Sequence, residues 1–405
     1  MAKLIGNVNP KALRELTVSI TEDEIKGQLE NVAKVYQKKA KIQGFRPGKA
    51  PLELVKSVFQ KEILEDAQDE AVRIKVLEEI KARKEDVVSE IFIKDKRSDE
   101  QGLTVTVEYE AIPTFLFPNL SSIKIEKKIR RISEIDVDDE IEKYQRKLGK
   151  LKAVDRESKE GDYLLVDYEE KEGGKIVKKK QNLTLYVSGE SINPALLEKF
   201  VSKKKGDVIE LDFHDDEKNK DIILLYRVKD VLELELPEVN DEFAKKLGYE
   251  NVEKMREEIR EYLIKQNEKA SEDELEWNII DQIYSRVQFE LPKTLVEEKI
   301  TRIAQSFKYD ATNEEVRNSS RKLAEDLVKK DIILTNFIEQ EGLEITEEEL
   351  SKNIEEKAKL YRMDPEKYRK ELERRGFVEG IKEEILRNKA MELLKNRIKV
   401  EVIIE

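Results

Sequence analysis

The stretch that decides the fold is residues 44–51, which read Gly44-Phe45-Arg46-Pro47-Gly48-Lys49-Ala50-Pro51. Its two glycines accept tight backbone geometry that other residues avoid, and its two prolines stiffen the turn. Phe45, Arg46 and Lys49 are therefore expected to project from a rigid loop. An aromatic ring and two cations at such a tip suit a polyanionic partner with an apolar crevice, such as structured RNA beside protein.

The charge around this loop opposes that of the chain. Residues 31–60 hold seven Lys or Arg residues and a single acid, Glu53, a local net charge of +6 in a chain of net charge −12. The competing interpretation is a solvated basic helix end followed by a turn. A phosphate-binding P-loop is excluded, because three residues instead of four separate Gly44 from the Gly48-Lys49 pair and Ala50 stands where Ser or Thr is required.

Composition sets wider bounds. A chain of 405 residues predicts two to four domains, and 41% charged against 39% apolar residues favours long exposed helices with thin cores. Cysteine is absent and His214 is the only histidine, which excludes disulfides, thiolate or multi-histidine metal sites and leaves a Ser-His-Asp triad unsupported. No signal peptide or apolar run of about 18 residues occurs, so a cytoplasmic protein is expected. The Lys and Glu bias predicts a thermophilic source.

Outward from the loop, the pattern predicts an α+β domain. Residues 13–20 alternate as a strand, and Thr21 with Glu24 forms a capping box that starts a helix ending near Gly44. Residues 52–83 are predicted to be helical as well, and residues 103–109 alternate as a second strand. Pro113 and Pro118 then mark the exit from this domain, and a charged connector follows to residue 150.

Two further regions follow the connector. Strands are predicted at 161–168, 183–187, 207–213 and 222–231, with a hairpin turn at Gly173-Gly174 and a helical insert at 194–201. This is a small α+β sheet domain. From residue 237 onwards the pattern is almost wholly helical, with a capping box at Thr346 and a helix end at Gly342.

The motif Gly-Phe-Arg-x-Gly-Lys-x-Pro after a basic amphipathic helix resembles the signature of bacterial trigger factor. Residues 236–244 (LPEVNDEFA) and 291–296 (LPKTLV) resemble later landmarks of that family, so the resemblance covers essentially the whole chain. It implies an elongated α+β multidomain protein. The implied parts are an N-terminal α+β ribosome-docking domain (1–112), a connector (113–150), a degenerate FKBP-like peptidyl-prolyl isomerase domain (151–236) and a C-terminal all-helical chaperone domain with arms (237–405).

The resemblance also implies partners. The loop residues Gly44, Phe45, Arg46, Pro47, Gly48 and Lys49 inherit docking on the large ribosomal subunit, at ribosomal protein and rRNA beside the peptide exit tunnel. Nascent and unfolded polypeptides are the implied clients, and a homodimer away from the ribosome is expected. No cofactor, metal or membrane is implied. The family's roles extend from protein folding to cell division and the cell cycle.

A candidate isomerase pocket follows residue by residue from the resemblance: Tyr168, Ile192, Leu196 and Tyr226. Lowering the amide rotation barrier of roughly 18–20 kcal/mol needs only an apolar cradle, so no acid, base or nucleophile marks such a site. Asn193 replaces an apolar residue, Leu196 replaces the floor aromatic, and the flap has shrunk to residues 214–220. Weak or absent activity is expected. The alternative is that the two tyrosines are ordinary core aromatics.

Client binding is assigned to the helical domain, where Phe337, Ile338, Met391 and Leu394 are candidates against the alternative that each belongs to the helix core. The leading hypothesis is an ATP-independent chaperone. Two alternatives stay open: a protein that acts chiefly as a proline isomerase, and a ribosome- or RNA-associated scaffold without chaperone activity. Trp277 is interpreted as a helix-packing anchor.

Overall fold

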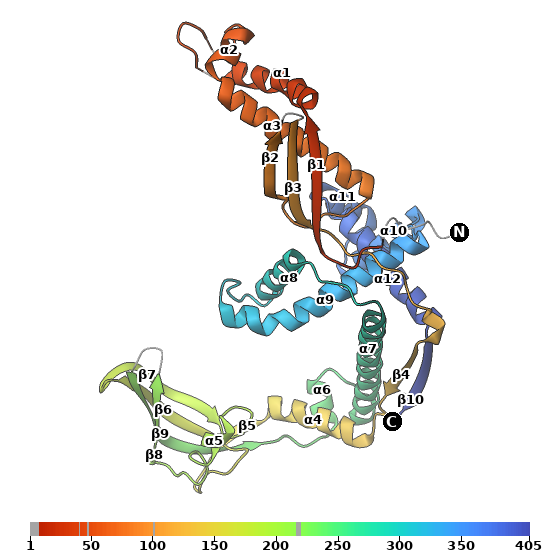
Figure 1. Cartoon of the computed structure of the whole chain (residues 1–405). Helices are drawn as coiled ribbons and strands as arrows, with labels where there is room; N and C mark the ends of the chain where they lie inside the picture. The colour runs from red at the N-terminus through yellow and green to blue at the C-terminus, as the bar shows by residue number, and fades with distance from the viewer. Residues whose placement is uncertain (1–7, 40, 47, 100–101, 216–219) are drawn as a thin grey trace. The chain divides into compact units, whose positions relative to one another are not determined.

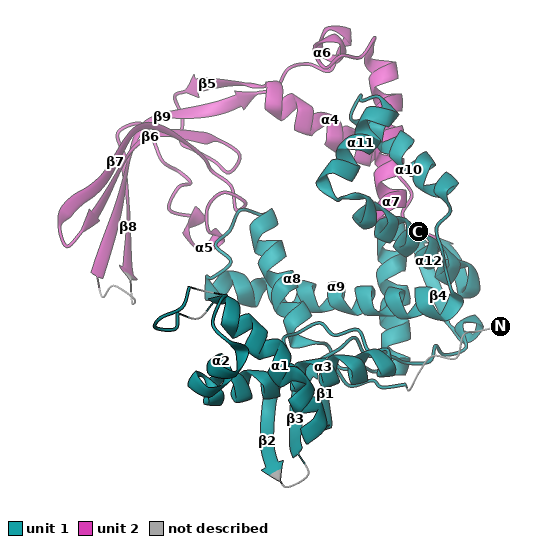
Figure 2. Cartoon of the chain, turned by 90° about the horizontal axis from the view of Figure 1, so that it is seen from above, with its two compact units in different colours: residues 1–128, 271–403 teal, residues 129–270, 404–405 magenta. Residues whose placement is uncertain are grey.

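The computed structural model describes residues 8–39, 41–46, 48–99, 102–215 and 220–405 (Figure 1). The chain divides into two compact units (Figure 2). The first contains residues 1–128 and 271–403, and the second contains residues 129–270 with 404–405. The mixed α+β fold class is confirmed. The predicted boundaries at residues 112, 150 and 236 stay predictions.

The first unit begins with a three-stranded antiparallel sheet of order β1-β3-β2. Its strands are β1 (Leu13–Thr21), β2 (Phe92–Asp99) and β3 (Gly102–Glu110), and its helices are α1 (Glu22–Lys39), α2 (Leu52–Val58) and α3 (Gln60–Arg83). Alternate residues of β1 and β3 are buried against α3. The strand at 13–20, the capping box at Thr21 and the strand at 103–109 are confirmed.

Two features of this region were not predicted. The helical structure expected over 52–83 is confirmed, but it is divided into two helices, because Phe59 leaves the helical conformation with φ −115° and ψ 33°. Its ring lies against Tyr36, with centroids 5.5 Å apart, so tertiary packing overrides a local pattern without glycine or proline. Strand β2 was not predicted, since its sequence FIKDKRSD carries mainly charged side chains.

The helical part of the first unit holds its largest core. Its elements are the later half of α7 (Val252–Val287), α8 (Lys293–Ser306), α9 (Glu314–Glu341), α10 (Glu347–Leu360), α11 (Pro365–Arg375) and α12 (Val378–Arg397). Buried Ile279, Ile300, Ile332 and Leu394 join α7, α8, α9 and α12 in one cluster. The 3-10 turn η1 (Leu120–Ser122) and β4 (Lys124–Ile129) precede the second unit, and β4 pairs with the unpredicted β10 (Lys399–Ile404).

The second unit contains one sheet with helices. Its strands β5 (Lys150–Val154), β6 (Tyr163–Glu172), β7 (Lys175–Tyr186), β8 (Val208–Asp215) and β9 (Lys220–Glu235) run in the order β5-β9-β6-β7, with β8 also beside β9. The helices are α4 (Glu134–Leu148), α5 (Pro194–Leu197), α6 (Asp241–Lys246) and the first half of α7. The predicted hairpin is confirmed: Gly173 and Gly174 take φ values of +53° and +80° between β6 and β7. Of the shortened flap, residues 216–219 lie outside the described residues.

Candidate functional site

The loop of residues 41–51 lies between α1 and α2 and rests on a small apolar cluster. Ala50 is buried there with Ala33 of α1, Val55 of α2 and Ile63 of α3, and Ile42 packs against them. The cluster also includes the Tyr36 and Phe59 rings, and the Tyr36 hydroxyl donates to Asp66 of α3 at 2.8 Å. Both ends of the loop are therefore anchored in apolar contacts, while its tip points away from them.

The tip has the geometry that its glycines predicted. Gly44 and Gly48 take φ values of +89° and +80°, which only glycine adopts without strain. The Phe45 amide donates to the Ile42 carbonyl at 3.1 Å, and the Lys49 amide donates to the Arg46 carbonyl at 3.0 Å. Phe45 is 42% exposed, and Arg46 and Lys49 are exposed as well. Pro47, the remaining candidate, lies outside the described residues.

The basic charge of this segment is largely unneutralised. Lys34 pairs with Glu30 at 2.9 Å, and Lys56 pairs with Glu53 at 2.9 Å. Five further cations form no salt bridge within the described part of the chain: Lys38, Lys39, Lys41, Arg46 and Lys49. A cluster of free cations around an exposed aromatic ring can bind phosphate oxygens and stack on a base or an apolar side chain.

In the second unit, the structure brings the candidate pocket residues to one face of the sheet. Tyr168 of β6 stands opposite Tyr226 of β9, with ring centroids 5.1 Å apart. Ile192 and Leu196 pack with Tyr226 against the same core cluster. Burial raises the pKa of both tyrosines, and the hydrogen bond from the Tyr168 hydroxyl to Glu170 raises the pKa of Tyr168 further. Both rings are therefore neutral apolar walls with a hydroxyl donor.

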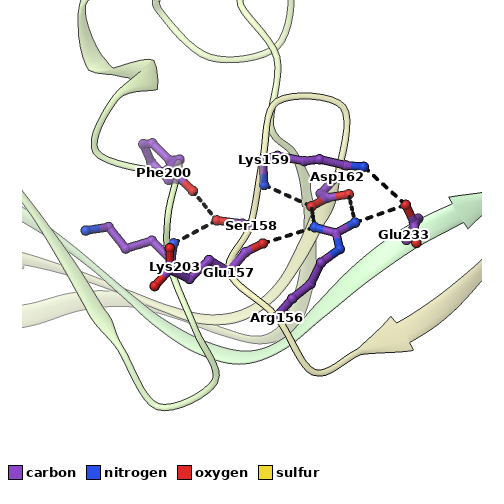
Figure 3. Close-up of polar contacts among 8 residues, drawn as sticks. All are labelled: Arg156, Glu157, Ser158, Lys159, Asp162, Phe200, Lys203 and Glu233. Carbon is purple, nitrogen blue, oxygen red and sulfur yellow. Dashed lines mark hydrogen bonds and ion pairs between the residues drawn. The ribbon is translucent and has the colours of Figure 1, made fainter.

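The floor of this face is held by a loop that sequence reasoning missed (Figure 3). Ser158 Oγ donates to the Phe200 carbonyl at 2.8 Å and accepts from the Lys203 amide at 2.9 Å. Buried Asp162 accepts two hydrogen bonds from Arg156, at 2.5 and 3.0 Å, and its carbonyl accepts from the Val187 amide at 2.8 Å. The loop thus fixes both ends of residues 187–203, the segment that carries Ile192 and Leu196.

That loop also sets the third aromatic wall. Phe200 meets Tyr226 edge to face at 5.5 Å, so the carbonyl bond from Ser158 holds a ring that touches the pocket. The contacts cross 42 residues of sequence, and no local pattern around Ser158 announces them. The burial of Asp162, which its pairing with Arg156 makes possible, becomes visible only in the structure.

The helical client candidates require a correction. Phe337, Met391 and Leu394 are at most 3% exposed and lie in the main core, as the helix-core alternative held. Ile338 is partly buried against the same core. The residues packed against them come from α7, α8 and the linker after β3. The sequence of one helix does not show which other elements will cover it. Phe337, Met391 and Leu394 are therefore core residues with little surface for an unfolded chain, and only Ile338 stays partly exposed.

Other apolar side chains of the helical part are exposed at helix ends. We define the first arm patch as Phe307 and Tyr309, which follow α8, are 64% and 61% exposed and stack with centroids 6.1 Å apart. We define the second arm patch as Leu360, Tyr361 and Met363 at the end of α10, where Leu360 is 81% exposed. Sequence periodicity missed both patches because they lie at or just beyond the ends of regular helices.

Metal and membrane chemistry find no support in the described residues. Over these residues, no group of three or more His, Asp or Glu side chains is arranged to hold a metal ion. The Nδ1 atom of His214 lies 2.7 Å from Asp221 Oδ1. No described helix combines the length and apolarity needed to cross a membrane.

Comparison with known proteins gives consistent matches. The family model described as bacterial trigger factor protein matches residues 3–144, and the model of the trigger factor C-terminus matches residues 251–396. Trigger factor of Halothermothrix orenii is 27% identical over 94% of this chain and 95% of its own length. Trigger factor of Aquifex aeolicus is 26% identical over 98% and 87%.

One solved structure has a similar fold. It is described as "Promiscuous Substrate Recognition in Folding and Assembly Activities of the Trigger Factor Chaperone". It is 21% identical, covers 98% of this chain and 99% of its own, and superposes with a TM-score of 0.50. At that identity the likeness concerns the fold alone.

Proposed function

Because the chain belongs to the bacterial trigger factor family, we propose that it is an ATP-independent chaperone that docks on the large ribosomal subunit and shelters nascent polypeptides. The observation that carries the proposal is the exposed basic loop at residues 44–51. It presents Phe45, Arg46 and Lys49 in a segment of net charge +6, whereas the chain carries −12. A local charge of this sign selects an anionic partner, and rRNA beside ribosomal protein at the exit tunnel is such a partner.

Docking of this kind is mostly electrostatic. Each phosphate that a Lys or Arg neutralises releases counterions. The logarithm of the binding constant therefore falls linearly with the logarithm of the salt concentration, with a slope of roughly 0.7–0.9 per contact. Phe45 adds a sequence-tolerant stacking or apolar contact that salt does not weaken. The loop geometry is compatible with both kinds of contact. The positive φ values of Gly44 and Gly48 produce a tight turn, so Phe45, Arg46 and Lys49 project from the same short segment.

The decisive experiment is ribosome co-sedimentation of a variant with Phe45→Ala, Arg46→Ala and Lys49→Ala. We expect it to abolish pelleting at a salt concentration where the parent binds. A matched control removes the same three residue types from the same region: Phe92→Ala, Lys94→Ala and Arg97→Ala on β2, all exposed. The control variant should pellet like the parent. Undiminished pelleting of the loop variant would refute the docking assignment.

Client handling is assigned to the two arm patches. When an unfolded chain covers exposed aromatic and aliphatic side chains at helix ends, removing their apolar surface from water stabilises the complex by about 25 cal/mol per Å². Small separate patches without defined pockets accept many sequences weakly and reversibly, which suits unfolded clients of varied sequence. Suppression of aggregation of a denatured client tests this part of the proposal. A protein that pellets with ribosomes but suppresses no aggregation is the scaffold alternative.

The remaining parts of the proposal follow the family. We assign docking to residues 1–112, a connector to 113–150, an FKBP-like domain to 151–236 and the chaperone helices to 237–405, and we assign the protein to the cytoplasm. A homodimer away from the ribosome belongs to the same proposal. Sedimentation of the purified protein over a concentration series measures it.

A second candidate function, proline isomerisation, is favoured by one observation. Tyr168 and Tyr226 face each other beside Ile192, Leu196 and Phe200, an apolar wall that can hold a twisted prolyl bond. A proline-limited refolding assay tests it. Acceleration that disappears with Tyr226→Ala supports the enzyme, and refolding at the uncatalysed rate excludes it.

A further inference from the structure

Gln37, in the last turn of α1, is bonded to the docking loop at two points. The Gly48 amide donates to the Gln37 carbonyl oxygen at 2.8 Å. The Gln37 side-chain Nε2 donates to the Ala50 carbonyl oxygen at 2.6 Å, across 13 residues of sequence. One residue therefore binds the returning limb of the loop with both its backbone and its side chain.

The position of Gln37 on α1 explains why its side chain can reach the loop. Gln37 lies four residues after buried Ala33 and next to Tyr36, so it continues the stripe of α1 that faces the apolar cluster under the loop. An amide on this stripe is partly buried and needs a partner, and the Ala50 carbonyl provides one. Ala50 is itself buried, so the bond is formed at the fixed base of the loop.

The rest of the described loop supplies little other support. Its remaining backbone hydrogen bonds in residues 41–46 and 48–50 are the two local turns, from Phe45 to Ile42 and from Lys49 to Arg46. A Cβ added at Gly44 or Gly48 would meet no atom of the described residues within 4 Å, so the backbone is open at both glycines. The bonds to Gln37, together with the burial of Ala50 in the apolar cluster, therefore tie the limb carrying Lys49 to α1.

We infer that Gln37 is a positioning residue of the docking loop: it holds the loop in the conformation that presents Phe45, Arg46 and Lys49, without itself touching the ribosome. The inference rests on the docking role proposed above. A loop that is ordered before binding loses less conformational freedom on binding, and a loop that samples other conformations binds in proportion to its competent fraction. Releasing the loop should therefore lower affinity without changing the number of ionic contacts.

The test uses Gln37→Met in the full chain. Methionine matches glutamine in length and helix propensity, carries no charge and lacks the amide donor. Ribosome affinity is measured by co-sedimentation over a salt series for the parent, Gln37→Met, Arg46→Ala and a control, Gln60→Met, at the exposed first residue of α3. Thermal unfolding of each variant shows whether the fold is kept.

We expect Gln37→Met to bind about 3- to 10-fold more weakly at every salt concentration, which corresponds to one hydrogen bond, with the parent's salt slope and thermal midpoint. Hydrogen exchange at the Gly48 amide should accelerate in the free variant. Arg46→Ala should instead reduce the slope of the logarithm of affinity against the logarithm of salt concentration by roughly 1, because one ionic contact is lost. Gln60→Met should match the parent throughout.

Three outcomes overturn the inference. Parent-like affinity of Gln37→Met, alongside weakened Arg46→Ala, removes Gln37 from the docking machinery and leaves docking intact. A flattened salt slope in Gln37→Met means that Gln37 acts on the contacts themselves. A thermal midpoint that falls together with affinity makes its role a general structural one. Failure of docking itself looks different, because then Arg46→Ala also binds like the parent.

Discussion

Replacing Asn336 by leucine should release the linker after β3 from helix α9. Asn336 is 2% exposed, and its Nδ2 donates to the carbonyl oxygens of Pro113 and Ile332 at 3.0 and 2.9 Å. Its Oδ1 accepts from the Phe115 amide at 3.4 Å. The side chain thus pairs with the extended linker as a neighbouring strand would, and it fixes Phe115 where that ring stacks on Phe289 at 5.0 Å.

The cost follows from the groups left behind. Leucine has the same branching and number of heavy atoms as asparagine and is somewhat larger, so the exchange leaves no cavity. The Ile332 carbonyl keeps its helical partner within α9, whereas the buried Pro113 carbonyl and Phe115 amide lose theirs. Each buried group without a partner costs about 1–3 kcal/mol, and the long Phe115 bond belongs at the low end, so we expect a loss of about 2–4 kcal/mol.

Urea unfolding followed by tryptophan fluorescence measures this loss. Trp277 is the single tryptophan of the chain and lies on α7 within the first unit, so its signal reports that unit. The matched control is Asn318→Leu, the same exchange at an exposed position of the same helix, which should stay within about 0.5 kcal/mol of the parent. If both variants unfold within about 0.5 kcal/mol of each other, the linker bonds contribute no net stability and the reasoning fails.

Two further substitutions probe how the first unit is joined. The Glu110 carboxylate accepts from the first two amides of α8, at 3.0 and 2.8 Å, so Glu110→Gln should lower the urea midpoint by the equivalent of about 1 kcal/mol, with Glu108→Gln as control. Lys395 pairs with Glu272 and Glu276 at 2.6 and 3.1 Å, so Lys395→Met should cost about 1–3 kcal/mol at pH 7. Hydrogen bonds from Lys395 and from other lysines lower the pKa of the Glu272 and Glu276 carboxyls. Burial acts in the opposite direction and raises both pKa values, and this effect is larger at Glu276. Stability from these pairs is therefore fully present above the ordinary value of 4.5 and is lost as pH falls from there through the lowered pKa values of the folded state, so the difference between the parent and Lys395→Met in urea unfolding should be constant down to about pH 5 and shrink only below it.

Much of the local structure was predictable because its causes lie within a few residues. The capping boxes at Thr21 and Thr346 form as their spacing required, with each hydroxyl accepting from the backbone amide three residues later. Gly342 ends α9 with φ +60°. Such signals depend on covalent neighbours alone, and the sequence displays them directly.

The missed features depend on residues that are distant in sequence. Nothing near Phe59 predicts a helix break, because the break serves packing against Tyr36. Asn336 and Gln37 look like ordinary polar residues of amphipathic helices until partners 223 and 13 residues away are in place. The candidate site shows the same difference between local and distant causes. Its glycines and cations identify the loop tip in the sequence, whereas no local pattern identifies Gln37, the residue that we propose holds the loop.

Two glutamate carboxylates and one backbone hydrogen bond attach the N-terminal sheet region to the helical part of the first unit. The Glu290 carboxylate accepts from the Ala12 amide at 3.1 Å, and the Glu290 amide donates to the Pro10 carbonyl at 2.8 Å. Together with the Glu110 bonds to α8, these contacts join β3 and the residues just before β1 to the start of α8, the helix that ends at the first arm patch. Bonds to both segments resist rotation better than one flexible linker could, so a docked loop would restrain α8 as well. Under the docking proposed above, we expect these bonds to restrain Phe307 and Tyr309 when the loop is bound, and we expect Glu110→Gln to loosen that restraint before it weakens docking.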